Sequence, residues 1–357
     1  MSPYAALGSA PEAREMIRHV SHAPRPEAFV VDAPARLHLG FMDPSATMGR
    51  RFASLGLVID GIGTRLEIAP SDRNEIALGT GVDTREATRL QHHLDTLQQR
   101  TGRDAPVCVT LSSVPPAHSG FGSGTQLALA IGHAFARFHR IDIGSAALAR
   151  LLGRGERSGV GVAGFDRGGL LLDGGPGAGG AIAPLLSRIE FPAEWRVVLV
   201  LDERIDGLSG VAERQAIETL PPFPRERAAD VCHQVLMRVL PGAMERDFVP
   251  FAEGVSAIQR LVGAHFAPAQ GGSMYTSGAV RRAIEWIEQR HRAATGQSSW
   301  GPTGFAILPS AQEAERAIEG ARAAGAVDPA LRLVVVRGRN YGARIGPVAG
   351  AAAAGAN

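Results

Sequence analysis

The first strongly patterned stretch of the chain is APARLHLGFMD, residues 33–43. From Leu37 to Phe41 every second side chain is apolar, with Arg36 and His38 at the alternate positions. A period of two predicts a half-buried strand, because successive side chains of a strand point to opposite faces. We therefore expect Arg36 and His38 on the polar face of this strand.

A helical period follows the glycine-rich stretch at residues 119–124. Leu127, Ile131, Ala134 and Phe138 recur every three or four residues, which predicts a helix that begins at these glycines. Similar patterns predict helices over 84–99, 145–154 (with Ser145 as N-cap), 210–220, 225–240, 247–262, 274–292 and 311–324. Strands are predicted over 54–60 and 64–70 (a hairpin around Gly61 and Gly63), 107–113, 168–175, 196–202, from 305, and over 331–337.

The order of these elements predicts an α+β protein with two domains. From Trp195 onward the order strand, helices, strand, helix, strand is typical of a ferredoxin-like domain. We assign residues 28–194 to a first domain and 195–345 to this second one. Residues 1–27 are expected to form an extension with one short helix around 12–20, and the low-complexity residues 346–357 a disordered tail.

The glycines at residues 120, 122 and 124 indicate a ligand-binding loop in the first domain. Glycine lets the backbone approach a ligand closely, and the first N–H groups of a helix are unpaired and lie at the positive end of its dipole. The hydroxyls of Ser119, Ser123 and Thr125 add donors. Together Gly120, Gly122, Gly124 and these hydroxyls predict a phosphate-binding loop. The alternative is a tight glycine turn with an ordinary N-cap.

The common nucleotide motifs do not fit this loop. A Walker A loop needs a lysine after its last glycine, whereas Gln126 follows Thr125, and the chain contains no lysine at all. The absence of lysine also excludes a Schiff-base lysine and pyridoxal phosphate linkage. The glycine spacing and the preceding Pro115-Pro116 differ from a Rossmann fingerprint.

Composition narrows the class further. The net charge of +2, with no basic run interleaved with aromatic residues, argues against a nucleic-acid surface. Two cysteines without a C-x-x-C motif exclude a disulfide framework and a zinc ribbon. We find no apolar run long enough for a membrane and no signal-peptide core, so the cytoplasm is the expected location.

Three motifs in this order resemble the GHMP kinase superfamily. They are the strand motif Ala33-Pro34-Ala35-Arg36, the loop at Pro115–Ser123, and the glycine-containing loop at Ser298–Phe305. The fuller segments ARLHLGFMD, PPAHSGFGSGTQLALA, RGERSGVGVAGFDRGGLLLDGG and GQSSWGPTGFAIL are similar to one non-kinase branch, the β-ribofuranosylaminobenzene 5′-phosphate synthases.

This resemblance implies a two-domain GHMP-kinase-like fold and a phosphoribosyltransferase of tetrahydromethanopterin biosynthesis. Its substrates would be 5-phosphoribosyl 1-pyrophosphate and a 4-amino- or 4-hydroxybenzoate, and its products a C-riboside 5′-phosphate, CO2 and pyrophosphate. Mg2+ would accompany the pyrophosphate, ATP would not be required, and the family implies a homodimer.

Within that chemistry the residues take provisional roles. Two anion sites are needed. We expect the glycine loop to supply one, and Arg154, Arg157 and Ser158 of a second glycine-rich loop, residues 154–169, to supply the other. Arg36 is expected to bind the benzoate carboxylate, because a guanidinium matches a carboxylate bidentately. The acidic roles, including an unidentified metal ligand, have Asp43, Glu156 and Asp166 as candidates.

Several of these residues keep a second interpretation. Asp166 is either a catalytic carboxylate or a solvated turn residue, since the stretch around it lacks the proline and serine of the kinase motif. His38 either takes part in catalysis or hydrogen-bonds across the sheet, and His118 either contacts phosphate or orients the loop. Trp300 is either packing or an apolar wall for the benzoate ring.

Two other functions remain open at this point. One is an ATP-dependent small-molecule kinase of the same fold. The other is a non-catalytic GHMP-fold binding protein.

Overall fold

Two long antiparallel strands, β2 (Phe29–Asp43) and β3 (Phe52–Pro70), organise the first sheet of the protein. The computed structural model describes residues 18–19, 28–208 and 210–348. In the sheet the strand order is β13-β2-β3-β5-β4, and β7 and β8 extend it from β3. The other strands are β4 (Glu75–Leu78), β5 (Val107–Ser113), β7 (Leu170–Asp173), β8 (Leu185–Ile189) and β13 (Arg344–Pro347).

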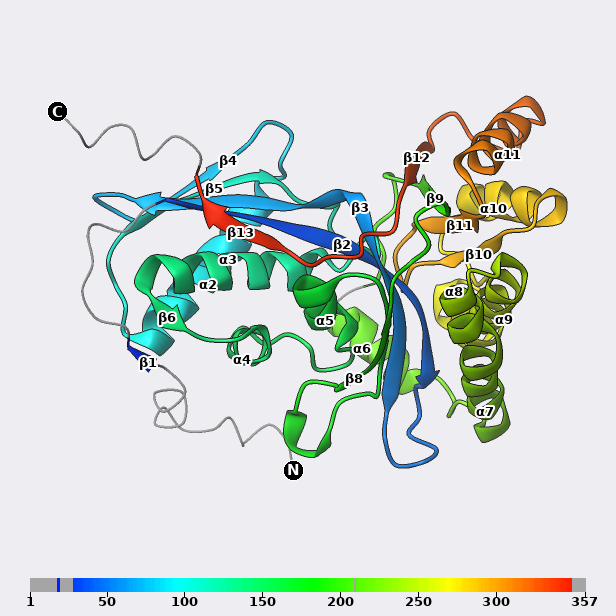
Figure 1. The fold of residues 1–357 in the computed structure, drawn as a ribbon, viewed down its shortest axis with the longest axis horizontal. Coiled ribbons are helices and arrows are strands. Elements are labelled where there is room, and N and C mark those ends of the chain that lie inside the picture. The colour runs from blue at the N-terminus through cyan, green and yellow to red at the C-terminus, as the bar shows by residue number, and fades with distance from the viewer. Residues whose placement is uncertain (1–17, 20–27, 209, 349–357) are drawn as a thin grey trace.

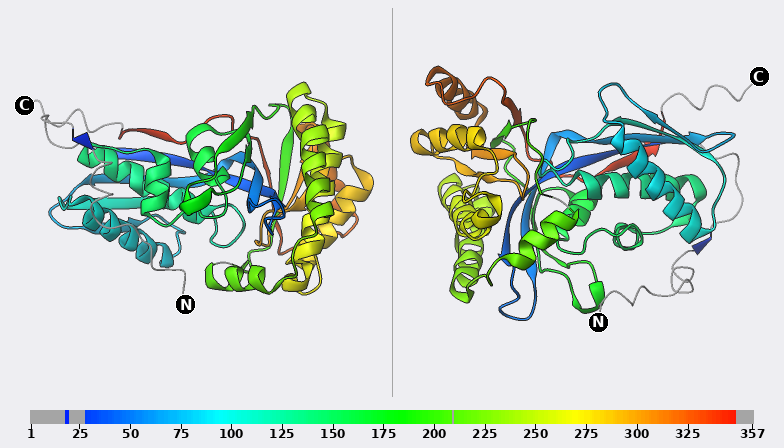
Figure 2. Two further views of the ribbon diagram at one scale, coloured as in Figure 1. Left: turned by 90° about the horizontal axis from the view of Figure 1, so that it is seen from below. Right: turned by 180° about the vertical axis from the view of Figure 1, so that it is seen from behind.

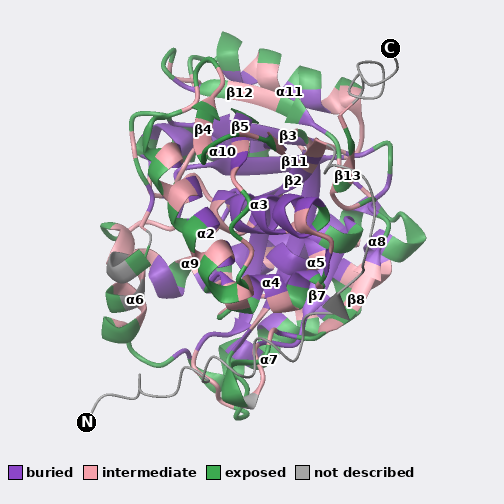
Figure 3. Ribbon diagram, turned by 90° about the vertical axis from the view of Figure 1, so that its left-hand side faces the viewer, coloured by how far each residue is buried: buried purple, intermediate pink, exposed green. Residues whose placement is uncertain are grey.

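Helices cover one face of this sheet (Figure 1). They are α2 (Arg85–Thr101), α3 (Ser123–His139), α4 (Ser145–Leu151) and α5 (Val160–Arg167). Apolar side chains of α2 and α3 share one core with Val31, Leu66 and Val109 of the sheet. Helix α3 is buried along most of its length and lies at the centre of the domain (Figure 3). Its N-terminus is thereby fixed beside the strands.

The second sheet is four-stranded with the order β10-β11-β9-β12 and is antiparallel throughout. Its strands are β9 (Arg196–Leu201), β10 (Ala294–Gln297), β11 (Gly304–Leu308) and β12 (Arg332–Val336). The helices of this domain are α6 (Gly210–Thr219), α7 (Arg225–Gln234), α8 (Leu240–Glu245), α9 (Phe248–Phe266), α10 (Gly278–Arg290) and α11 (Ala311–Ala323). A π-helical turn, Val235–Val239, precedes α8, and a 3-10 turn, Ala267–Gln270, follows α9. This order and connectivity give the ferredoxin-like domain that the sequence predicts.

Alternation along β9 explains how the two halves join. Val198 and Val200 belong to a core with α10 and α11. Val197 and Leu199 point the other way, into a core shared with α7, α9 and Leu37 of β2. The long strands β2 and β3 run from the first half toward the second (Figure 2). The first sheet therefore forms part of the floor on which the second domain packs.

Several expectations from the sequence need correction. The hairpin predicted around Gly61 and Gly63 is one continuous strand, β3, because both glycines continue the strand instead of reversing it. Gly346 and Pro347, expected in a disordered tail, belong to β13, which pairs with β2. Residues 349–357 lie outside the described residues.

Three further elements differ from expectation. The helix predicted around 12–20 lies mostly outside the described residues, and at its end Arg18–His19 form a short strand, β1, that pairs with β6 (Ile141–Asp142). The polar stretch at 154–169, expected as a loop, contains helix α5. The N-cap of α4 is Gly144 and not Ser145.

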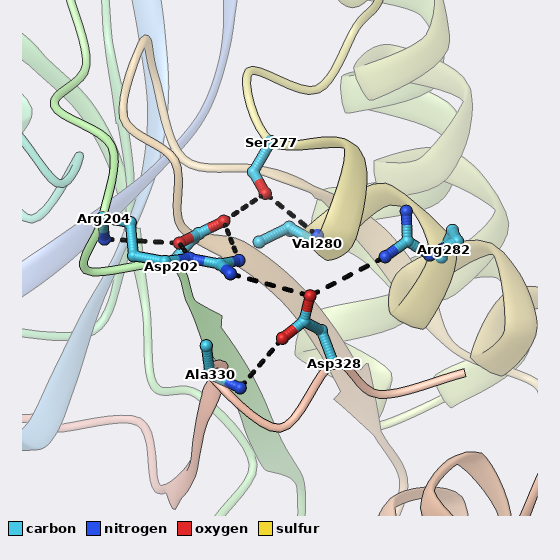
Figure 4. Close-up of polar contacts among 7 residues, drawn as sticks. All are labelled: Asp202, Arg204, Ser277, Val280, Arg282, Asp328 and Ala330. Carbon is cyan, nitrogen blue, oxygen red and sulfur yellow. Dashed lines mark hydrogen bonds and ion pairs between the residues drawn. The ribbon is translucent and has the colours of Figure 1, made fainter. Parts of the chain in front are cut away.

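A polar cluster at the end of β9 ties the second domain together (Figure 4). Asp202 is 2% exposed; it accepts hydrogen bonds from Arg204 Nε (2.7 Å) and Nη2 (2.9 Å) and from Ser277 Oγ (2.7 Å), the N-cap of α10. Arg204 and Arg282 both approach Asp328, at 3.7 and 3.9 Å. The hydrogen bonds from Arg204 hold the pKa of Asp202 at about 2.

We predict that Asp202→Asn lowers the free energy of unfolding at pH 7 by about 1–2 kcal/mol, a modest value because solvent screens the half-exposed Arg204. The folded-state pKa of Asp202 lies below its unfolded value near 4, so the carboxylate stabilises the fold fully above about pH 4 and loses this effect as the pH falls toward 2. Urea unfolding of both proteins from pH 7 to pH 2.5 checks this. The difference in the free energy of unfolding between the native protein and Asp202→Asn should become smaller only in the acid range. A difference that is constant with pH would contradict the assignment. Glu203→Gln, which breaks the exposed pair with Arg332, is the matched control and should cost less.

Candidate active site

The glycine loop before α3 encloses the side chain of Arg36. Arg36 Nη1 donates a hydrogen bond to Gly120 O (2.6 Å), and Arg36 N donates to Phe121 O (3.1 Å). Gly120 and Gly122 have φ of +85° and +72°, and a Cβ on Gly122 would lie 2.9 Å from Arg36 Cζ. Only glycine lets the loop close over the guanidinium in this way. Burial lowers the pKa of Arg36 to about 10, against the raising influence of Glu213, so the group stays cationic at neutral pH.

A second loop, residues 298–303, packs against the glycine loop. Ser298 Oγ donates to Gly120 O (2.7 Å) and accepts from His38 N (2.9 Å). A Cβ on Gly120 would lie 2.1 Å from Ser298 O, and one on Gly301 would lie 2.3 Å from Gly120 N. The three motifs that resemble the GHMP kinases therefore meet at one point, around Gly120.

Two arginines approach the start of α3 from the other side. A Cβ on Gly124 would lie 3.1 Å from Arg89 Nη2 and 3.3 Å from Arg154 Nη1. Arg154 Nε is buried with no hydrogen-bond partner. Burial lowers the pKa of Arg154, and the charge of Arg89 lowers it further. Two cations held together at the positive end of a helix form a site that favours an anion.

Arg89 has no recognisable signal in the sequence, because it lies on an amphipathic helix whose polar face looks like ordinary solvent surface. It hydrogen-bonds Glu86 at 2.6 and 2.9 Å. Its neighbourhood with Arg154 and Gly124 arises only when α2 packs beside α3.

Of the residues predicted to bind an anion in the second glycine-rich stretch, Arg157 and Ser158 are bonded to carboxylates of the protein. Arg157 pairs with Glu213 of α6 at 2.5 Å, so it lies close to the site together with a carboxylate that the sequence did not single out. Ser158 donates to Asp173 Oδ2 (3.2 Å). Asp173 is fully buried and also accepts from the backbone of Ser54 and Gly159, so Ser158 helps to anchor the stretch to the sheet.

The three predicted acidic residues do not gather at the glycine loop. Asp43 accepts from Ser45 N, Thr47 N and Thr47 Oγ1 at 2.7–3.1 Å, which gives it a role in the turn after β2. Glu156 is exposed and lies near Arg154, whose positive charge it favours.

Asp166 accepts a hydrogen bond from Ser145 Oγ, which is also bonded to His133 Nε2 (2.7 Å). His133 lies about 15 Å along α3 from its start, by the rise of an α-helix. Burial raises the pKa of Asp166. The structure therefore places Asp166 in a polar contact among α3, α4 and α5, not at the phosphate loop.

The hydroxyls predicted for the loop differ in their surroundings. Ser119 Oγ donates to Ala117 O (3.2 Å) within the loop. Ser123 is buried at the first turn of α3, and Thr125 packs against α5, where a Cβ on Gly161 would lie 3.2 Å from its Cγ2. His118 has φ of +57°, and its carbonyl accepts from Gly207 N (3.2 Å), so its backbone helps to shape the loop.

His38 and Trp300 lie together in a hollow behind the loop 298–303. His38 is 4% exposed, and burial lowers its pKa to about 3, with the positive charge of Arg36 as the second cause. Trp300 is also 4% exposed, and its ring meets Phe266 at 4.7 Å.

A separate groove runs along the far side of Ser119. It measures about 390 Å³ and is lined by the acidic side chains Asp83, Glu86, Glu203 and Asp206, with Arg85 as its basic member. A polyphosphate would meet repulsion from these carboxylates. Positive charge is instead available at Arg36 and at Arg154, and Arg89 beside Arg154 is bonded to Glu86 of the groove.

Sequence comparison places the chain among known proteins. Beta-ribofuranosylphenol 5′-phosphate synthase of Archaeoglobus fulgidus is 30% identical over 325 residues, which cover 87% of this chain and 97% of that protein. The chain belongs to this family. The synthase of Methanothermobacter thermautotrophicus is 28% identical over 88% of this chain and 97% of that protein. The chain is therefore an enzyme of the synthase type.

Domain and structure comparisons agree with the fold of this synthase family member. The GHMP kinases N terminal domain family matches residues 88–169, and the GHMP kinases C terminal family matches residues 239–327. A homoserine kinase of Cytophaga hutchinsonii superposes with a TM-score of 0.60 at 16% identity, covering 92% of this chain and all of that one. A mevalonate diphosphate decarboxylase of Enterococcus faecalis gives 0.62 at 15% identity, covering 90% of this chain and 99% of that one. Among the described helices none is long and apolar enough to cross a membrane.

We predict that Arg154→Gln weakens binding of inorganic pyrophosphate about 10–100-fold, the effect of one lost charge-assisted contact. The melting temperature without ligand should stay the same or rise, because the substitution removes the repulsion between Arg154 and Arg89. Titration calorimetry and thermal unfolding measure the two effects. Arg150→Gln, at an exposed position on α4, is the control. Unchanged pyrophosphate affinity would place the anion elsewhere.

Proposed function

We propose that this synthase family member joins 5-phosphoribosyl 1-pyrophosphate to 4-hydroxybenzoate and releases CO2 and pyrophosphate. The relatives' name specifies a phenol that carries a β-ribofuranosyl 5′-phosphate. Loss of CO2 from a 4-hydroxybenzoate leaves a phenol, whereas a 4-aminobenzoate would leave an aniline. The pathway that uses such a product, tetrahydromethanopterin biosynthesis, is part of this proposal.

The observation that carries the proposal is the pair of cationic positions on either side of one glycine loop. Arg36 lies beneath Gly120 and Gly122, and Arg89 and Arg154 lie beside Gly124. The acceptor carries a carboxylate and the sugar donor carries phosphates, so the two substrates together need anion sites that are separate but close. A single phosphate-binding loop with one cation would serve only one of these substrates.

The proposed reaction needs the protein to position the two substrates and to stabilise negative charge. The bond between C1 and the pyrophosphate oxygen breaks, and the electron pair leaves with pyrophosphate. The ring carbon that bears the carboxylate then bonds to C1, and loss of CO2 returns the electron pair of the broken C–C bond to the ring. Arginines held on the leaving group stabilise its developing charge, and a fixed acceptor ring removes the entropic cost of the encounter. Arg36 Nε is buried without a partner, which leaves a donor for the benzoate carboxylate.

We propose that a magnesium ion is carried mostly by the substrate. The described residues contain no group of three or more acidic, histidine or cysteine side chains able to hold a metal. Mg2+ commonly keeps several waters and binds substrate phosphates with few protein ligands. Glu213, paired with Arg157 beside Arg36, is the carboxylate we assign to its neighbourhood. When bound, the ion would neutralise charge on the departing pyrophosphate.

An ATP-dependent kinase has less support. The chain has no lysine for a nucleotide phosphate, the groove beside Ser119 is acidic, and Asp166 is engaged with Ser145 in the described structure. The homodimer implied by the family stays a prediction.

We predict release of labelled CO2 from carboxyl-labelled 4-hydroxybenzoate when the protein is incubated with Mg2+ and 5-phosphoribosyl 1-pyrophosphate without ATP. Release should require the sugar donor, and 4-aminobenzoate should be the slower acceptor. ATP-dependent phosphorylation of a small molecule with no CO2 release would contradict the proposal.

We further predict that Arg36→Lys lowers kcat/KM for 4-hydroxybenzoate at least 10-fold, because an ammonium lacks the planar fork that serves both Gly120 O and a carboxylate. The acceptor KM and kcat are measured at saturating sugar donor. Arg50→Lys, remote from the loop and bonded to Gly175 O at 3.1 Å, is the matched control. An unchanged acceptor KM and kcat in Arg36→Lys would move the carboxylate site elsewhere.

A further inference from the structure

The hollow behind the loop 298–303 contains a buried polar atom with no partner. His38 Nε2 is inaccessible to solvent and makes no hydrogen bond within the protein. The space beside it is about 40 Å³ to a water-sized sphere, and about 410 Å³ when all the empty space out to its open mouth is counted. A buried polar atom without a partner is unfavourable unless a ligand or water supplies one.

The walls of this hollow suit a flat aromatic ring. The ring of Phe41 lies 4.4 Å from that of His38, and the rings of Phe266 and Trp300 meet edge to face at 4.7 Å. Met274 adds a thioether to the lining. Aromatic faces and a polarizable sulfur favour contact with another π system.

The glutamines that line the hollow are already engaged. Gln259 donates to Leu39 O (2.8 Å) and accepts from Gln297 N (2.9 Å). Gln297 Nε2 donates to Gln270 Oε1 (2.8 Å) and to Ser299 O (3.1 Å). The imidazole of His38 is thus a buried acceptor of this wall without a partner in the protein, beside the hydroxyl of Ser299 and the indole of Trp300.

The hollow is next to the phosphate loop. His38 N and Gly120 O share the hydroxyl of Ser298. Arg36 and His38 pair in register with Val58 and Gly56 of β3, so they lie on one face of β2, about 6.5 Å apart by the rise of a strand.

We infer that this hollow binds the aromatic ring of the acceptor, with its 4-hydroxyl donating a hydrogen bond to His38 Nε2 and its carboxylate-bearing carbon toward Arg36 and the glycine loop. The inference rests on the proposed function and adds the position and orientation of the acceptor. As the hydroxyl donates to His38, its oxygen becomes richer in electrons and increases electron density at the para carbon, which is the carbon that attacks C1. The neutral imidazole accepts this bond at physiological pH, because its pKa lies near 3.

The test is the preference of the protein for 4-hydroxybenzoate over benzoate, measured by titration calorimetry in the presence of pyrophosphate. The native protein should bind 4-hydroxybenzoate about 10-fold more tightly than benzoate. His38→Phe should retain benzoate and lose the preference, and His38→Gln, whose amide oxygen can accept the same bond, should restore part of it. His139→Gln, a half-buried histidine at the end of α3 that packs on Phe135 and Phe138 and not on the hollow, should leave the preference unchanged.

A second variant tests the position independently of His38. Val262→Phe adds a ring to the wall from α9 and should weaken binding of both benzoates at least 10-fold while pyrophosphate affinity stays the same. Preserved preference in His38→Phe, or preserved aryl binding in Val262→Phe, would overturn the inference.

These binding readouts need no turnover, so they separate the two proposals. Loss of preference in His38→Phe without any CO2 release from the native protein would keep the ring site and remove the proposed reaction. CO2 release with an unchanged preference in His38→Phe would keep the reaction and move the ring site.

Discussion

The carbonyl oxygen of Gly120 is the point on which the site depends. It accepts hydrogen bonds from Arg36, 84 residues earlier in the chain, and from Ser298, 178 residues later. A hydrogen bond from a charged donor contributes about 1.5–3 kcal/mol, and here it also fixes the loop that begins α3. No side chain fits at Gly120, since a Cβ would lie 2.1 Å from Ser298 O. One backbone atom therefore links the first sheet, the phosphate loop and the second domain at the site.

This arrangement gives the site two unlike sides. On one side Arg154 lies close to Arg89 at the start of α3; Arg89 is paired with Glu86, whereas Arg154 Nε has no partner, and the charge of Arg89 lowers the pKa of Arg154. On the other side Arg36 adjoins a hollow with aromatic walls. A polyanionic sugar donor and a flat aromatic acid would each find a matching side, and their reactive carbons would meet at the glycine loop. The same fold in kinases binds other ligands, so the side chains at these two sides, and not the fold, carry the argument for function.

Local patterns predicted the parts of the fold that depend on neighbours in sequence. The strand expected over 107–113 is β5, Val107–Ser113, and the glycines do precede α3. The hairpin predicted at Gly61 and Gly63 is wrong, because glycine permits a turn without requiring one, and strand β3 continues through both residues. Pairing of β13 with β2 joins residues more than 300 positions apart, which no local pattern can indicate.

The site could be predicted only where its chemistry lies within one segment. The loop glycines and Arg36 come together as expected, because each belongs to a motif with its own signal. The glycine-rich pattern around Asp166 predicts a loop, whereas the structure has helix α5 there, which directs Asp166 toward Ser145. Arg89 and Glu213 reach the site through the packing of α2 and α6, and their sequence surroundings resemble ordinary polar helix faces.

The most direct test of the central claim is a 31P NMR spectrum of the complete reaction without ATP. The protein, Mg2+, 5-phosphoribosyl 1-pyrophosphate and 4-hydroxybenzoate should convert the donor signals into pyrophosphate and one new sugar 5′-phosphate in equal amounts. Removing 4-hydroxybenzoate should leave the donor intact. Conversion to ribose 5-phosphate regardless of the acceptor, or no conversion at all, would contradict the account.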